Sequence, residues 1–146
     1  MDKKYWVKSS YDEHDVKVLL KDLSNCVKEV SVQESERLIQ SGTHYSEMIP
    51  KEYKPSDEYN NVFNRVLKVS LHKTAVYTAA VSEKLFYLHG KGLVLISLAR
   101  AGTPVGILMK RYLKFRYNVD IPHYTISIIR DKGIDENAMD YIYNEL

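Results

Sequence analysis

The chain has 146 residues, of which 45% are hydrophobic and 27% are charged, and its formal net charge is +2 at pH 7. These values are typical of one globular domain that buries its own core, and the sequence contains no internal repeat, low-complexity tract or linker. The small net charge argues against a nucleic-acid partner. We therefore predict a single domain over residues 1–146.

Residues that form disulfides and metal sites are few or poorly spaced. Cys26 is the only cysteine, which excludes an internal disulfide and a zinc site built from several thiolates. We expect no metal bound by side chains, because no metal-ligand spacing relates His14, His72, His89 and His123. No apolar run is long enough to span a membrane and no signal-peptide core follows the first residues, so we expect a cytoplasmic protein without a membrane partner.

The first third of the chain contains signals for one strand and one helix. Residues 16–22 alternate imperfectly between apolar and polar side chains, which predicts a short edge strand. Ser31 and Glu34 form a capping-box pattern. This pattern predicts a helix over residues 34–41, which Gly42 ends.

A long helix is predicted in the middle of the chain. Residues 44–55 contain two prolines and predict an irregular connection. Ser56 is suited to cap a helix whose apolar residues recur at helical spacing as far as Leu88. Serine and β-branched residues weaken helix propensity at residues 70–74, where a break in the helix is possible.

The last third alternates strands and helices. Apolar runs predict strands over residues 93–98 and 123–129, and a helix over residues 104–117 separates them. A final helix follows Asp135, which is suited to cap it. Two strands joined by a helix describe a parallel βαβ unit. The predicted fold class is therefore α/β, with a parallel βαβ core and an N-terminal helical extension.

The turn between the first of these strands and its helix has features of an anion site. Thr103 is a good N-cap and Pro104 suits the first helical position, so the turn ends at a helix N-terminus with free N–H groups. Arg100 can bind phosphate oxygens in a bidentate manner, and Gly102 allows a positive φ. We predict that Arg100, Ala101, Gly102 and Thr103 bind phosphate or pyrophosphate. The alternative is that these residues only start a helix.

A second turn follows the second strand and is expected at the same edge of the sheet. In open parallel sheets, ligands bind beyond the carboxyl ends of the strands. Arg130, Asp131 and Lys132 follow the second strand there and are candidates for the same anionic pocket. The alternative is an ordinary strand-to-helix turn with solvated charges.

Two further residues are candidates for catalysis. His44 lies close in sequence to Glu47 and is a candidate general acid or base, with an ordered hinge as the alternative. Cys26 with a histidine is the minimum for a thiolate nucleophile. The sequence around Cys26 resembles no established nucleophile signature, and a lone cysteine is usually inert.

Longer motifs carry a resemblance to known families. LARAGTPVG (residues 98–106) resembles the pyrophosphate-binding loop of type I phosphoribosyltransferases. Together with SLARAGTPVGILMKRYL (residues 97–113), the segments HYTISIIRDKGID (residues 123–135) and HYSEMIP (residues 44–50) resemble the bacterial StiP family, which is found with tellurium-resistance and stress genes. The resemblance covers the chain from about residue 16 to its end.

Members of the StiP family are described both as phosphoribosyltransferase-like and, by name, as cysteine proteases. The transferase interpretation implies that residues 100–103 hold the pyrophosphate of phosphoribosyl pyrophosphate, with Mg²⁺ as cofactor and an anionic small molecule as partner. It also implies that this loop can carry a strained non-proline cis peptide. The protease interpretation implies that Cys26 is the nucleophile. A non-catalytic interaction module is a third possibility, because the long helix has enough apolar surface to pair with another subunit or with the absent C-terminal remainder of the protein.

The sequence departs from the transferase pattern in one motif. The carboxylate pair and the Thr- and Gly-containing loop that hold the ribose 5-phosphate are missing. Asp131 is a single carboxylate between two cations, and the pair Asp135-Glu136 is followed by Asn-Ala and not by a phosphate-binding loop. The family pattern implies that this motif lies beyond residue 146. We therefore expect the chain to be the N-terminal portion of a longer protein, without transferase activity as it stands.

Overall fold

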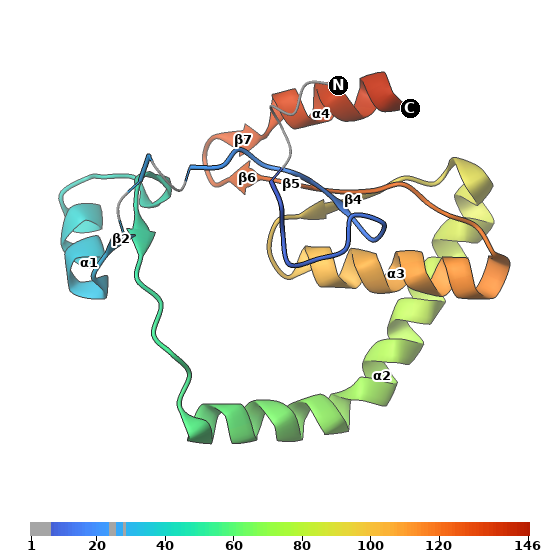
Figure 1. Ribbon diagram of the computed structural model, residues 1–146, viewed down its shortest axis with the longest axis horizontal. Coiled ribbons are helices and arrows are strands. Elements are labelled where there is room, and N and C mark those ends of the chain that lie inside the picture. The colour runs from blue at the N-terminus through green and yellow to red at the C-terminus, as the bar shows by residue number, and fades with distance from the viewer. Residues whose placement is uncertain (1–6, 24–25, 28) are drawn as a thin grey trace. The chain divides into compact units, whose positions relative to one another are not determined.

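The computed structural model describes residues 7–23, 26–27 and 29–146 (Figure 1). The chain forms two compact units. The sheet unit consists of Met1–Lys21 and Ser70–Leu146, and the small unit consists of Asp22–Val69. Helix α2 (Asp57–His89) contributes residues to both units, and the extent of the predicted single domain stays a prediction.

Three parallel strands form the centre of the sheet unit: β1 (Lys17–Leu19), β4 (Leu95–Leu98) and β5 (His123–Ile126). Strand β5 lies between the other two, and it pairs with both in parallel. Helix α3 (Gly102–Tyr117) connects β4 to β5. The predicted βαβ unit is confirmed, and the predicted edge strand is β1.

Helices α3 and α4 (Glu136–Glu145) cover opposite faces of this sheet (Figure 1). Successive side chains of a strand point to opposite faces, and the core follows this alternation. Val18 belongs to one buried cluster with Ile107 of α3, whereas Leu19 belongs to another with Ile142 of α4. A third cluster fills the space between β4 and α3, and its buried members are Leu93, Leu95, Met109, Leu113 and Ile121. The sheet unit therefore has three layers, α/β/α.

A β-hairpin follows β5. Its strands, β6 (Ile128–Ile129) and β7 (Gly133–Ile134), pair in an antiparallel manner. Asp131 and Gly133 have positive φ angles of 64° and 103°, as tight hairpin connections require. The predicted strand over residues 123–129 is therefore split in two. The following segment is a hairpin, and the predicted strand-to-helix turn is wrong.

The small unit contains a second, two-stranded sheet. Strands β2 (Glu29–Val30) and β3 (Ile49–Pro50) pair in parallel, and α1 (Val32–Gln40) lies between them in sequence. Ser31 Oγ accepts a hydrogen bond from the backbone N–H of Glu34 at 3.1 Å, which confirms the predicted cap. The N-terminal part is not a helical extension, because it contains β2 and also supplies β1 to the central sheet.

Helix α2 is continuous from Asp57 to His89. Ser56 Oγ accepts from the backbone N–H of Tyr59 at 3.2 Å, as the predicted cap requires. The predicted break at residues 70–74 is wrong, because serine and β-branched residues reduce helix propensity by only tenths of a kcal/mol each, about 0.5. Among the described helices, none combines the length and the apolar character needed to cross a membrane.

The C-terminal part of α2 is tied to α3 through a carboxylate. Glu83 accepts hydrogen bonds from the hydroxyls of Tyr112, at 2.7 Å, and of Tyr117. These two bonds hold the pKa of Glu83 below its usual value. Leu85 and Phe86 pack beside them against the buried cluster of β4 and α3. The second half of α2 is thus part of the sheet unit's packing.

Candidate active site

The turn after β4 starts a helix, but Thr103 does not cap it. Ala101 immediately precedes the helix. Its φ and ψ angles of −59° and −19° are helical, and its side chain makes no capping hydrogen bond. Thr103 Oγ1 instead donates to the carbonyl of Leu98 at 3.1 Å and lies 2.7 Å from Thr125 Oγ1. Thr103 is only 4% exposed. The predicted N-cap role of Thr103 is therefore wrong, because its hydroxyl joins α3 to the sheet.

The backbone of this turn is also partly engaged. The N–H of Arg100 donates to the carbonyl of Leu98 at 2.7 Å, and the N–H of Thr103 donates to the carbonyl of Arg100 at 3.1 Å. Gly102 is not among the residues with positive φ, and no peptide bond of the described residues is cis. Gly102 therefore does not use the positive φ that a glycine allows. Anion binding by Arg100, Ala101, Gly102 and Thr103 stays a prediction.

Strands β4 and β5 end at the same edge of the sheet, but only the turn at residues 99–103 directly follows one of them, since residues 130–132 follow β6. Leu98 and Ile126, the last residues of β4 and β5, are paired in register. Arg130, Asp131 and Lys132 form the exposed tip of the β6–β7 hairpin beyond this edge. Their part in an anionic pocket stays a prediction.

A buried serine–histidine pair lies inside the sheet unit, and the sequence analysis missed it. Ser97 Oγ of β4 is 2.8 Å from His123 Nε2 of β5. His123 Nδ1 lies 2.9 Å from the backbone carbonyl of Asp15. A carbonyl only accepts, so Nδ1 donates to it and Nε2 accepts from the serine hydroxyl. The pair therefore joins β4, β5 and the segment before β1.

The two side chains of this pair are almost completely buried, which favours a structural role. His123 is 2% exposed and Ser97 is 8% exposed. Burial lowers the pKa of His123, and the charge of Lys110 acts in the same direction. The imidazole is therefore held neutral inside the protein. Gly106 of α3 leaves the space for it, since a Cβ on Gly106 would lie 2.7 Å from His123 Cε1 and still closer to Nε2 and to Ser97 Oγ. The glycine inside a predicted helix is the one sequence signal of this close approach.

The neutral state of His123 predicts a specific acid sensitivity. The pKa of His123 is lower in the folded chain than in the unfolded chain, so its contribution to stability is complete above about pH 6.5 and is lost as pH falls through the folded value. In this window we expect the free energy of unfolding to fall by at most about 1.4 kcal/mol per pH unit. Urea unfolding between pH 7.5 and 5 should show this slope in the natural chain and a flatter one in His123→Gln. Equal slopes would contradict the assignment.

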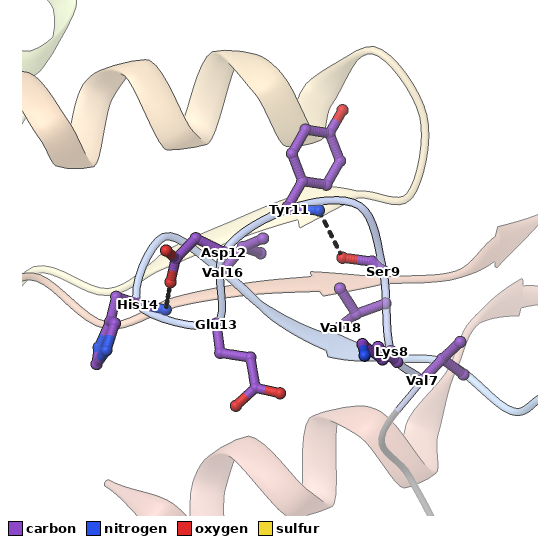
Figure 2. A pocket seen from close by; sticks show the side chains of 9 residues that line it. All are labelled: Val7, Lys8, Ser9, Tyr11, Asp12, Glu13, His14, Val16 and Val18. Atoms are coloured by element: carbon purple, nitrogen blue, oxygen red, sulfur yellow. Dashed lines mark hydrogen bonds between the residues drawn. The ribbon is translucent and has the colours of Figure 1, made fainter.

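In the sheet unit, two cavities are lined by described residues. One has a volume of about 390 Å³, and its lining comes entirely from the segment of residues 7–18, as Figure 2 shows. In this segment the N–H of Tyr11 donates to Ser9 Oγ and the N–H of His14 donates to Asp12 Oδ1 (Figure 2). The other cavity, of about 370 Å³, is lined by charged residues and by His123. Neither cavity is lined by the candidate nucleophile Cys26 or by residues 99–103.

The small unit holds both candidate catalytic residues. Cys26 is exposed, and its N–H donates to the carbonyl of Leu23 at 2.8 Å in a turn that leads to β2. His44 lies before β3, as the first residue of the turn that contains the 3₁₀ helix Tyr45–Glu47. In the parallel pair, Glu29 of β2 is in register with Ile49 of β3. In sequence, Cys26 precedes β2 by three residues and His44 precedes β3 by five residues.

The imidazole of His44 is fixed by its neighbours. His44 Nδ1 accepts a hydrogen bond from the backbone N–H of Ser46 at 3.4 Å and lies 2.7 Å from Ser46 Oγ, and the ring centroids of His44 and Tyr45 are 4.6 Å apart. With Nδ1 accepting from this N–H, the proton of the neutral ring is on Nε2. In the other tautomer, Nδ1 donates to Ser46 Oγ and Nε2 carries the free lone pair. Such a histidine can take a proton from a thiol and return it to a leaving group. No hydrogen bond among the described residues joins the thiol of Cys26 to a histidine.

Comparison with known proteins identifies the family of this chain. A family model described as tellurite-like stress resistance cysteine protease StiP matches residues 9–146. The chain is 35% identical over 134 residues to the Cysteine protease StiP of Acinetobacter baylyi (strain ATCC 33305 / BD413 / ADP1), a match that covers 91% of this chain and 34% of that protein. The chain belongs to the StiP family. No solved structure matches it.

These matches correct the transferase interpretation. Both carry the description cysteine protease and neither carries a phosphoribosyltransferase description. The phosphoribosyltransferase function expected from the loop at residues 98–106 is therefore wrong, and the finding favours the alternative, in which Cys26 is the nucleophile. The expected Mg²⁺ and phosphoribosyl pyrophosphate belonged to that interpretation. A transferase-like fold likewise has no support from a solved structure. The chain spans about a third of the length of the curated relative it matches.

Proposed function

We propose that this chain has cysteine peptidase chemistry, with Cys26 as the nucleophile and His44 as the general base and acid. The observation that supports the proposal is the parallel pairing of Glu29 with Ile49, since the exposed Cys26 precedes β2 in sequence and the turn of His44 precedes β3. The name of the curated relative, a cysteine protease, supports the reaction class. Cys26 is the only thiol that this chain offers.

The proposed reaction has two steps. His44 Nε2 takes the proton of the Cys26 thiol, and the thiolate attacks the carbonyl carbon of the peptide bond to give a thioester, while His44 returns the proton to the leaving amine. A water molecule then attacks the thioester carbonyl, with His44 again taking its proton. The acid product leaves and the Cys26 thiol is restored. Each proton taken in one half of the cycle is returned in the same half.

Ser46 is the positioning residue of this proposal. Its hydroxyl lies 2.7 Å from His44 Nδ1, and a hydrogen bond there decides which ring nitrogen carries the lone pair. Accepting from Nδ1 leaves Nε2 basic and limits rotation of the ring. A nucleophile, a base and a third group that orients the base are the recurring parts of covalent catalysis.

The test is peptidase activity of the purified chain on fluorescently labelled casein. Cys26→Ser should abolish the activity, because a serine hydroxyl without a thiolate is a far weaker nucleophile. His72→Gln, which changes an exposed histidine of α2, serves as the control and should keep full activity. Activity that survives in Cys26→Ser would overturn the proposal.

A further inference from the structure

One edge of the central sheet is unpaired in the part of the chain that the structure describes. Strand β4 pairs with β5 on one side only. The N–H groups of Leu95 and Ala99 donate to carbonyls in or beside β5, and in a strand the backbone groups of alternate residues point to opposite sides. The N–H groups of Ile96 and Leu98 and the carbonyl of Ile96 therefore point away from β5. We call this outward backbone of Ile96 and Leu98 the β4 edge.

Apolar side chains lie beside the β4 edge. Ile96 and Leu98 are 43% and 46% exposed, whereas Leu95 and Ser97, which point to the face that α3 covers, are buried. The alternation of side chains places Ile96 and Leu98 on the other face, which is the face of α4. The described members of the buried cluster under α4 do not include these two residues. An added strand would therefore find free backbone groups and two apolar side chains on which to pack.

The charge around the β4 edge is positive. No acidic residue occurs between Lys84 and Val119, the segment that contains β4. Lys91 precedes β4 and Arg100 follows it, and both residues are exposed. No ion pair of the described residues involves either of them. An exposed cation at each end of the strand favours a partner that has acidic residues on both sides of an apolar centre.

We propose that the β4 edge binds an extended segment of another protein, in which apolar and polar residues alternate between acidic ends. The bound segment adds a further strand to the sheet, and its backbone pairs with the outward groups of Ile96 and Leu98. Its apolar side chains pack on these two residues, and its acidic residues lie near Lys91 and Arg100. The proposal is independent of the proposed peptidase chemistry, because the candidate catalytic residues belong to the small unit.

Charge argues against a second copy of the chain as the occupant. A two-fold pair of β4 strands would be antiparallel, and it would bring Lys91 of one copy close to Arg100 of the other. Like charges opposite each other on neighbouring strands are unfavourable, and charged side chains at an edge are a usual means against self-pairing. An acidic segment is attracted by the same two cations. The β4 edge therefore favours a partner of opposite charge over its own copy.

Fluorescence anisotropy with a synthetic peptide tests the charge complementarity. The probe is fluorescein-labelled Glu-Asp-Val-Thr-Ile-Thr-Val-Asp-Glu, and every titration uses the Cys26→Ser background, so that cleavage cannot consume the probe. The double change Lys91→Glu and Arg100→Glu should weaken binding by at least about tenfold, and it should create binding of Lys-Lys-Val-Thr-Ile-Thr-Val-Lys-Lys. This new binding also shows that the variant is folded. Lys84→Glu, which changes an exposed cation of α2, is the matched control and should leave binding of the probe unchanged.

Methylated probes test the backbone pairing without a change in the protein. Alternate amides of a bound strand face β4, so one version of the probe carries N-methyl groups on both threonines and the other carries them on both valines. One version should lose at least about tenfold in affinity, and the other should bind like the probe itself. The version that loses affinity shows whether the segment runs parallel or antiparallel to β4. Equal affinities of the two versions, no binding of the probe at about 1 mM, or pairing of the chain with its own copy through β4 in place of the probe would overturn the proposal.

Discussion

Among substitutions that add a single methyl group, Gly106→Ala is expected to lower the stability of the chain the most. The added Cβ would lie inside van der Waals contact with His123 and Ser97, which are buried and hydrogen-bonded to each other at 2.8 Å. Neither side chain can move away without breaking a buried hydrogen bond. Overpacking of this kind costs about 3 kcal/mol, which lowers the melting temperature by roughly 6–12 °C for a chain of this length.

Gly102→Ala is the matched control, since it changes the other glycine of the same helix. A Cβ there meets its nearest atom, Ser97 Cβ, at 3.8 Å, which is ordinary contact. Gly102 also lacks a positive φ, so alanine fits its backbone. Calorimetry should find Gly102→Ala within about 0.5 kcal/mol of the natural chain. Similar melting temperatures for the two variants would show that α3 is not packed against His123 as described.

His44→Gln is expected to reduce peptidase turnover by about a thousandfold, within the range that general acid–base catalysis contributes. Glutamine has a similar size and can still accept near the N–H of Ser46, so the turn before β3 should remain folded. It cannot take and return a proton. The measurement is kcat and KM on labelled casein, and the loss should appear in kcat with little change in KM.

Two companion variants separate catalysis by His44 from a structural role. Ser46→Ala removes the hydroxyl 2.7 Å from Nδ1, and it should cause a smaller loss of kcat and shift the pH profile of the reaction. His89→Gln replaces the last residue of α2 and should leave kcat unchanged. If His44→Gln keeps normal turnover, His44 has no part in the reaction.

Local signals predicted most of the elements of the fold. Ser31 and Ser56 cap α1 and α2 as expected, since a side-chain oxygen next to a helix start has few other partners. The two apolar runs around residues 93–98 and 123–126 pair in parallel with α3 between them. These features depend on neighbours within a few residues, which the sequence displays directly.

Features that depend on distant contacts were not predictable in the same way. Thr103 has the sequence position of an N-cap, yet its hydroxyl bonds to the carbonyl of Leu98 and lies beside Thr125 of the adjacent strand. The bond between Ser97 and His123 joins residues 26 positions apart. The sequence around Thr103, Ser97 and His123 does not indicate these partners, because tertiary packing decides between the local and the distant hydrogen bond.

The functional prediction failed for a related reason. A strand, an arginine–glycine turn and a helix are compatible with phosphate binding, but they are equally the parts of an ordinary βαβ connection. In the structure, the N–H groups of Arg100 and Thr103 both donate to carbonyls of the chain. The strands β2 and β3, which Cys26 and His44 precede in sequence, have only two residues each, too few for a periodic pattern.

The most direct test of the account is the rate at which iodoacetamide alkylates Cys26 at pH 6.5, followed by mass spectrometry of the intact chain. Only the thiolate reacts, and a neighbouring histidine increases its fraction at this pH. Alkylation of the natural chain should be at least about tenfold faster than alkylation of His44→Gln and of the chain unfolded in guanidinium chloride. Equal rates in all three samples would contradict the central claim that Cys26 and His44 act as a pair.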